Sequence, residues 1–102
     1  MDILIGKNAR HNWELIEAAE PHDIWFHVAD GPSSHCILVT HNQKPDRKQL
    51  KQVAVLCKQH SRSKSLKKVE IHYTPICNVL IDEKGSPGSV ILTGPGCKSI
   101  FI

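Results

Sequence analysis

The chain has 102 residues, the size of one compact domain, so we expect residues 1–102 to form a single domain. Hydrophobic residues make up 40% and charged residues 23% of the sequence, a balance that excludes wholesale disorder. Apolar runs stay far below the roughly 18 residues needed to span a bilayer, and the first ten residues lack the layout of a signal peptide. We therefore expect a cytoplasmic protein without a membrane segment.

The formal net charge of +3 hides an asymmetry along the chain. Residues 11–43 contain five acidic residues and no Lys or Arg, whereas residues 44–68 contain nine of the 13 cationic residues and one acid, Asp46. The nine are Lys44, Arg47, Lys48, Lys51, Lys58, Arg62, Lys64, Lys67 and Lys68. Such a density favours a polyanionic partner, because each phosphate that a cation neutralises releases bound counterions.

The chain begins with a short strand and a helix. Residues 3–5 are apolar and end at a glycine, a pattern typical of a strand. Residues 8–20 predict a helix, with Asn8 or Asn12 as the N-cap and a proline just after its end.

A hairpin is predicted next. Residues 24–28 alternate with a period of two, which places Trp25 and His27 on the same face of a strand. Residues 30–34 include Gly and Pro and predict a loop that leads to a second strand over 35–40.

Residues 46 to about 62 predict the clearest helix of the sequence. Asp46 is suited to its N-cap, and apolar residues recur at i, i+3, i+4 and i+7, so one stripe faces the core. At about 100° per residue, four cations gather along one edge beside that stripe. They are Arg47, Lys51, Lys58 and Arg62.

The last third predicts a basic connector and several short strands. The connector covers 61–68, strands are expected over 69–74, 77–82, 89–93 and 98–102, and turns over 83–88 and 94–96. The order of elements predicts an α+β fold in which two helices pack on a mostly antiparallel sheet of short strands.

Four cysteines, Cys36, Cys57, Cys77 and Cys97, lie too far apart to form a CxxC or CxxH pair. We therefore expect free thiols, and neither a metal nor a cofactor.

Three motifs occur in order along the chain: Gly6-Lys-Asn-Ala-Arg-His-Asn12, then Asp23-Ile-Trp25-Phe-His27 followed by Pro32-Ser-Ser34-His35, then Val69-Glu-Ile-His-Tyr73-Thr-Pro75. From Ile3 to Ile102 the chain resembles the NFACT-R domain, the RNA-binding module of NEMF- and RqcH-type proteins of ribosome-associated quality control. The resemblance implies a stand-alone, non-catalytic module that binds structured RNA, tRNA or ribosomal RNA. It also implies the ribosome or quality-control proteins as further partners.

The chain departs from the family pattern at two places. Ser33 stands where the family has a glycine, at a position that would favour a positive φ. Trp13 stands where the family has an aspartate, which removes an acid there.

We assign the expected contacts to two groups of residues. The cations Arg47, Lys48, Lys51, Lys58, Arg62 and Lys64 would position the phosphate backbone, extended by Lys67 and Lys68. The hairpin residues Trp25, His27, Ser34 and His35 would make more specific contacts, supported by Asn12 and Asp23 as cap and turn residues. Histidines at a phosphate site would strengthen binding below about pH 6.5, as they become charged.

Alternatives to this interpretation stay open. Trp25 either stacks on an unpaired base or packs in the core, since the chain has few aromatic residues. The basic helix would equally suit an adaptor that docks on acidic proteins or on DNA. A small hydrolase or nuclease using His27 and His35 as acid and base is the third possibility.

Overall fold

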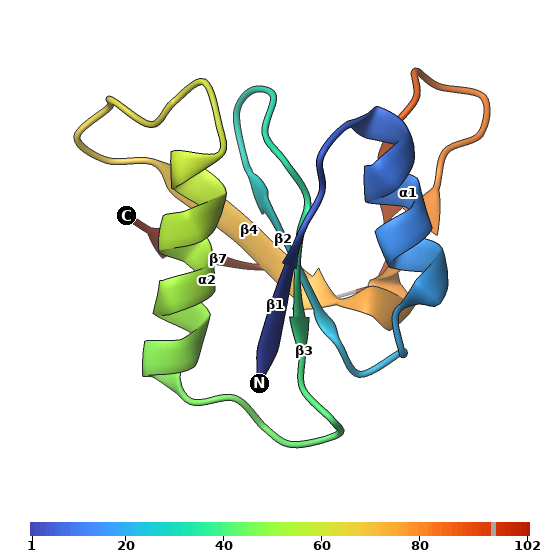
Figure 1. Cartoon of the computed structure of the whole chain (residues 1–102), viewed down its shortest axis with the longest axis horizontal. Coiled ribbons are helices and arrows are strands. Elements are labelled where there is room, and N and C mark those ends of the chain that lie inside the picture. The colour runs from blue at the N-terminus through green and yellow to red at the C-terminus, as the bar shows by residue number, and fades with distance from the viewer. Residues whose placement is uncertain (95) are drawn as a thin grey trace.

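A computed structural model describes residues 1–94 and 96–102, and its central element is a five-stranded sheet with a layer on each face (Figure 1). The strands are β1 (Asp2–Ile5), β2 (Ile24–Val28), β3 (Cys36–Val39), β4 (Glu70–Pro75) and β7 (Lys98–Phe101), in the spatial order β1-β3-β2-β4-β7. β5 (Val79–Ile81) and β6 (Val90–Leu92) form a separate hairpin. The strand pairs are antiparallel, which confirms the predicted α+β class and sheet.

One face of the sheet is covered by α2 (Arg47–Gln59). Asp46 caps this helix as predicted: its Oδ1 accepts from the Gln49 N–H at 2.7 Å, and Gln49 Oε1 accepts from the Asp46 N–H at 2.9 Å. The helix ends at Gln59, so the prediction that Arg62 belongs to it is wrong. Apolar residues of α2 pack on those of β2, β3 and β4 in one buried cluster, which includes Phe26, Leu38, Val53, Ala54, Cys57 and Ile71.

The opposite face is covered by α1 (Ala9–Ala18) and the β5–β6 hairpin. Asn8 is the N-cap of α1, because its side chain accepts from the His11 N–H at 2.9 Å. Asn12 therefore lies inside the helix. A second buried cluster joins this layer to the sheet and consists of Ile16, Trp25, Ile37, Ile76 and Val79.

The chain leaves the large sheet through a short 3₁₀ helix, η1 (Ile76–Asn78). The prediction of a continuous extended segment over 77–82 is wrong at its start, because η1 redirects the chain into the β5–β6 hairpin. The predicted turn over 83–88 joins β5 to β6. Of the predicted turn over 94–96, residue 95 lies outside the described residues.

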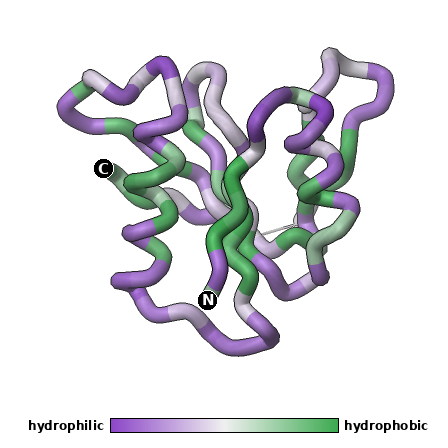
Figure 2. Tube along the Cα trace, viewed as in Figure 1, coloured by the Kyte–Doolittle hydropathy of each residue, from purple (hydrophilic) through white to green (hydrophobic). Residues whose placement is uncertain are grey.

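Four connections meet at one end of the sheet, the upper end in Figure 1. They are the residues that lead into α1, the β2–β3 loop, the segment after α2 and the β5–β6 turn. Figure 2 shows that these connections are mostly hydrophilic, whereas the central strands are hydrophobic. Among the described residues, neither helix is long and apolar enough to cross a bilayer.

Candidate nucleic-acid interface

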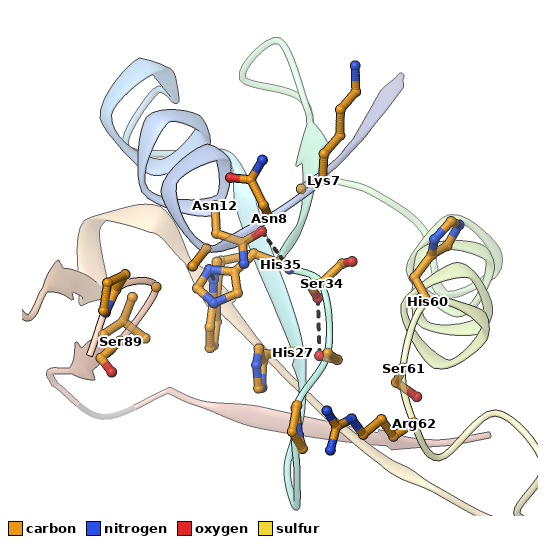
Figure 3. Close-up of a pocket in the computed structure, with 18 of the residues that line it drawn as sticks. Lys7, Asn8, Asn12, His27, Ser34, His35, His60, Ser61, Arg62 and Ser89 are labelled. Atoms are coloured by element: carbon orange, nitrogen blue, oxygen red, sulfur yellow. Dashed lines mark hydrogen bonds between the residues drawn. The ribbon is translucent and has the colours of Figure 1, made fainter. Parts of the chain in front are cut away.

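An open groove of about 1100 Å³ lies at this end of the molecule, between the four connections (Figure 3). The residues that lead into α1 contribute Gly6, Lys7 and Asn8 to it, and α1 itself contributes Ala9 and Asn12. The β2–β3 hairpin contributes Trp25, His27, Pro32, Ser33, Ser34 and His35. The far walls consist of residues 59–62, Lys64 and residues 86–90.

Positive charge dominates this groove. Three exposed cations, Lys7, Arg62 and Lys64, lie on its walls together with His27, His35 and His60. The lining residues, all from the described part of the chain, include no Asp or Glu. Such a surface attracts anions, because no fixed negative charge opposes the cations nearby.

Three rings form the floor of the groove: Trp25, His27 and His35. Trp25 is only 3% exposed, and its indole N–H donates to Nδ1 of His35 at 3.1 Å. The Trp25 and His27 rings are stacked, with centroids 5.6 Å apart, and His35 meets both edge-on. A ring so enclosed packs as part of the core, so of the two interpretations of Trp25 the structure favours packing over stacking on a base.

Burial sets the protonation of the two floor histidines. Burial, with a smaller contribution from the neighbouring His27, lowers the pKa of His35 to about 4. Burial also lowers the pKa of His27, although the hydrogen bond to the Val28 carbonyl opposes this shift. The expectation that such histidines become charged below about pH 6.5 is therefore wrong for His35, since desolvation disfavours its charged form.

The backbone of His35 is fixed by the motif at the start of α1. Its N–H donates to Oδ1 of Asn12 at 3.2 Å (Figure 3). Its carbonyl accepts from the Gly6 N–H at 2.9 Å. A Cβ at Gly6 would overlap the Asn12 side chain. Glycine is thus needed at position 6 because Asn12 occupies the space that a side chain would take.

The comparisons with known proteins agree with this architecture. The sequence profile of the NFACT protein RNA-binding domain matches residues 1–94. The chain belongs to this family. This confirms the resemblance that the sequence motifs carry, over nearly the whole chain.

Two curated relatives of this NFACT RNA-binding domain are bacterial proteins named Rqc2 homolog RqcH. The one from Bacillus subtilis (strain 168) is 33% identical over 91 residues, which covers 88% of this chain and 16% of the relative. The one from Streptococcus suis (strain 05ZYH33) is 30% identical over 93 residues, which covers 90% and 17%. The chain thus spans about a sixth of the length of these relatives.

A solved structure has a similar fold. It is the C-terminal part of the fibronectin/fibrinogen-binding protein from Streptococcus suis, with a TM-score of 0.88 and 29% sequence identity. The match covers 98% of this chain and 39% of that one, so both layers of the fold described above have a counterpart in it.

Both departures from the family pattern have a structural role in this NFACT RNA-binding domain. Ser33 is not among the residues with positive φ, a conformation that Gly31 adopts instead, at +114°. The Ser33 hydroxyl accepts from the Val28 N–H at 3.2 Å and donates to the Ser34 carbonyl at 3.1 Å, which closes the β2–β3 loop. The indole N–H of Trp13 donates to the Ser89 carbonyl at 2.9 Å and fastens the β5–β6 turn to α1.

The structure gathers some predicted contact residues in the groove and leaves others outside. Trp25, His27, Ser34, His35, Arg62, Lys64 and the supporting Asn12 line it. Arg47, Lys48 and Lys51 are exposed in the first half of α2, whose 13 residues span about 20 Å, so they lie toward the end of α2 that points away from the groove.

Three further predicted residues have contacts elsewhere. The Lys58 ammonium donates to the Ile102 carbonyl at 3.1 Å, and that of Lys68 lies 5.4 Å from the centre of the Phe101 ring. Asp23 accepts from the N–H groups of Glu20 and Thr40, so it is a turn residue as expected, but it does not line the groove.

The sequence motifs did not single out Lys7, His60 or the 86–89 turn as groove residues. Lys7 follows Gly6 inside the first motif, and its place in that motif was the only sequence feature that could have indicated a role in the groove. His60 reaches the groove because it is the C-cap of α2, and the 86–89 turn because Trp13 holds it.

Proposed function

We propose that this NFACT RNA-binding domain binds RNA in the groove and does not catalyse a reaction. The observation that supports this most strongly is the combination of three cations with no carboxylate among the described lining residues. The RNA phosphate backbone carries one negative charge per nucleotide and is drawn to such a groove. Membership of an RNA-binding family supports the same ligand class.

The helix ends suggest where the phosphates would lie. α1 presents its N-terminal residues Asn8 and Ala9 to the groove, and the unpaired N–H groups there carry a partial positive charge. α2 presents its C-terminal end, with Gln59 and His60, where the partial charge is negative. We therefore place a phosphate nearest to Lys7, with Arg62 and Lys64 contacting neighbouring phosphates along the other wall.

The identity of the RNA is a finer part of the proposal. We propose structured RNA of the translation apparatus, tRNA or ribosomal RNA, within ribosome-associated quality control in the cytoplasm. The similarity to two proteins named Rqc2 homolog supports this assignment. The ribosome or quality-control proteins would be further partners. Within an assembly with them, this domain would provide contacts to RNA.

The exposed cations of α2 form a second basic surface, defined by Arg47, Lys48 and Lys51. We assign it weaker and less specific phosphate contacts, because it is a convex helix face on which cations attract phosphate but no groove encloses the ligand. The same surface is where an acidic protein partner would dock.

Fluorescence anisotropy with three labelled ligands tests the proposal. They are tRNA, double-stranded DNA with the same number of phosphates, and an acidic polypeptide, each titrated at several salt concentrations. We expect the tightest binding to tRNA, persisting near physiological salt, and recovery of the RNA intact. Equal, salt-labile binding to all three ligands would contradict the proposal and favour an adaptor, and cleavage of the RNA would contradict the absence of catalysis.

A further inference from the structure

The two histidines at the floor of the groove offer opposite hydrogen-bonding groups. Trp25 donates to Nδ1 of His35, so this nitrogen carries no proton and the proton of the neutral ring is on Nε2. Nδ1 of His27 lies 2.6 Å from the Val28 carbonyl oxygen, which only accepts, so this nitrogen carries the proton and Nε2 has a free lone pair. In the neutral rings, Nε2 of His35 is therefore a donor and Nε2 of His27 an acceptor.

Both Nε2 atoms are available to a ligand. Neither has a partner among the hydrogen bonds of the described residues, and no buried side-chain nitrogen or oxygen of that part of the chain lacks a partner. Nε2 of His35 is consequently not sealed inside the core, although the residue as a whole is only 3% exposed. The ring centroids are 5.1 Å apart and the ring planes are nearly perpendicular, at 87°, so the two side chains lie within reach of one small ligand.

We propose that His35 and His27 read the edge of an unpaired nucleobase at the floor of the groove. Nε2–H of His35 donates to a ring nitrogen or carbonyl oxygen of the base, and Nε2 of His27 accepts from its amino or imino group. The inference rests on the proposed function and adds which part of the RNA enters the groove: a base, with its flanking phosphates held by Lys7, Arg62 and Lys64.

A phosphate fits this pair poorly. Ionised phosphate oxygens only accept hydrogen bonds, so a phosphate would place negative charge against the lone pair of His27. A nucleobase presents a donor next to an acceptor on its Watson–Crick edge. In a duplex that edge is occupied by the opposite strand, and the deep groove of A-form RNA is too narrow for side chains to read. An unpaired nucleotide, by contrast, offers both histidines a partner on one exposed edge.

The positions of the protons can be tested without any RNA. Nitrogen-resolved NMR of the histidine side chains at pH 7.5 should find the proton on Nε2 of His35 and on Nδ1 of His27. The reverse assignment for either ring would overturn the inference, because the two side chains would then present groups of the same kind.

Binding is tested with His27→Phe, which keeps a ring against Trp25 and removes the acceptor. The control is His72→Phe, the same change in the cross-strand partner of His27, which does not line the groove. The probes are an eight-nucleotide oligouridylate, an RNA duplex of equal charge, and polyphosphate as a base-free polyanion. We expect the wild type to prefer the oligouridylate, and His27→Phe to weaken its binding about tenfold, the usual cost of one lost hydrogen bond, while polyphosphate binding stays unchanged.

The outcomes separate this inference from the proposed function. Two results would overturn the inference that the groove binds a base and would leave RNA binding itself intact. One is that His27→Phe weakens the binding of oligouridylate and of polyphosphate equally. The other is that the wild type binds duplex and single-stranded RNA with equal affinity. Failure of Arg62→Ala/Lys64→Ala to weaken any RNA would instead reject the groove as the RNA site, and this inference with it. An oligodeoxythymidylate of the same length distinguishes DNA as the source of the base: tighter binding to it than to the RNA would overturn the assignment to RNA.

Discussion

Trp25 donates its indole N–H to Nδ1 of His35 at 3.1 Å, and this contact joins the hydrophobic core to the floor of the groove. The Trp25 ring packs with Ile16 and Ile37, so the position of its N–H is determined by the core. His35 is held from the other side by Asn12, through its backbone N–H. The position of the His35 imidazole at the floor of the groove is thus set by Trp25, and that of its backbone by Asn12.

Trp25→Phe removes this donor and should lower the free energy of unfolding by about 1–3 kcal/mol, because Nδ1 of His35 keeps its desolvation cost without a partner. Urea denaturation measures the loss. Trp13→Phe is the matched control, since it removes another indole N–H whose acceptor, the Ser89 carbonyl, lies on a half-buried residue. A smaller loss is expected for the control, and an equal loss would contradict a special role for the Trp25–His35 contact.

Gly6→Ala should destabilise the fold by about 1–3 kcal/mol, because the new methyl group overlaps the Asn12 side chain and displaces it from the His35 N–H. The change in unfolding free energy is measured alone and in an Asn12→Ala background, which removes the overlapping atoms. The cost of Gly6→Ala should be smaller in that background. Strictly additive losses would show that the two positions are not in contact.

The stability of the domain should fall as the pH is lowered from about 6.5 to about 4. In the unfolded chain, His35 takes up a proton near its ordinary pKa of 6.5. In the folded protein it takes up that proton only near its lowered pKa of about 4, so within this window the unfolded state binds more protons. The contribution is fully present above pH 6.5, and its loss amounts to about 3 kcal/mol when complete. His27, whose pKa burial also lowers, acts in the same direction.

The pH dependence is assigned to His35 by comparing the wild type with His35→Gln, a neutral side chain that still accepts from Trp25. Unfolding free energies are measured by urea denaturation between pH 7.5 and 4. The difference between the two proteins should shrink as the pH falls through this window. A constant difference would mean that His35 does not titrate in this way.

The parts of the fold that depend on short sequence patterns could be predicted. The period of two in residues 24–28 and the Asp46 cap with its apolar stripe are local, so β2, the hairpin and α2 follow from the sequence alone. The end of α2 could not be placed, because residues 60–62 lack a proline or glycine that would stop a helix. Arg62 was therefore predicted on the edge of the helix, whereas in the structure it lies after α2, in the wall of the groove.

The composition of the groove could be predicted only in part, since it depends on contacts between distant segments. Asn12 and His35 are 23 residues apart, and Trp13 and Ser89 are 76 apart, so no periodicity connects them. Lys58, in contrast, was predicted to contact RNA but is engaged by a distant part of the chain. It belongs to the predicted cationic edge, but its ammonium is bonded to the Ile102 carbonyl of a strand end that only the folded chain brings beside α2.

The central claim is that the groove, and not the basic helix face, is the main RNA surface. Two double variants test it, Arg62→Ala/Lys64→Ala in the groove and Lys48→Ala/Lys51→Ala on α2. Each pair removes two positive charges at exposed positions, so their effects on net charge are equal. Any difference between them therefore reports where the RNA lies.

The measurement is the affinity for labelled tRNA over a series of salt concentrations. The groove pair should weaken binding more than the helix pair, and should flatten the slope of log K against log salt by about 1.4–1.8, the contribution of two phosphate contacts. The helix pair should leave most of that slope in place. A greater or equal loss of affinity and slope in Lys48→Ala/Lys51→Ala would contradict the claim and move the RNA to α2.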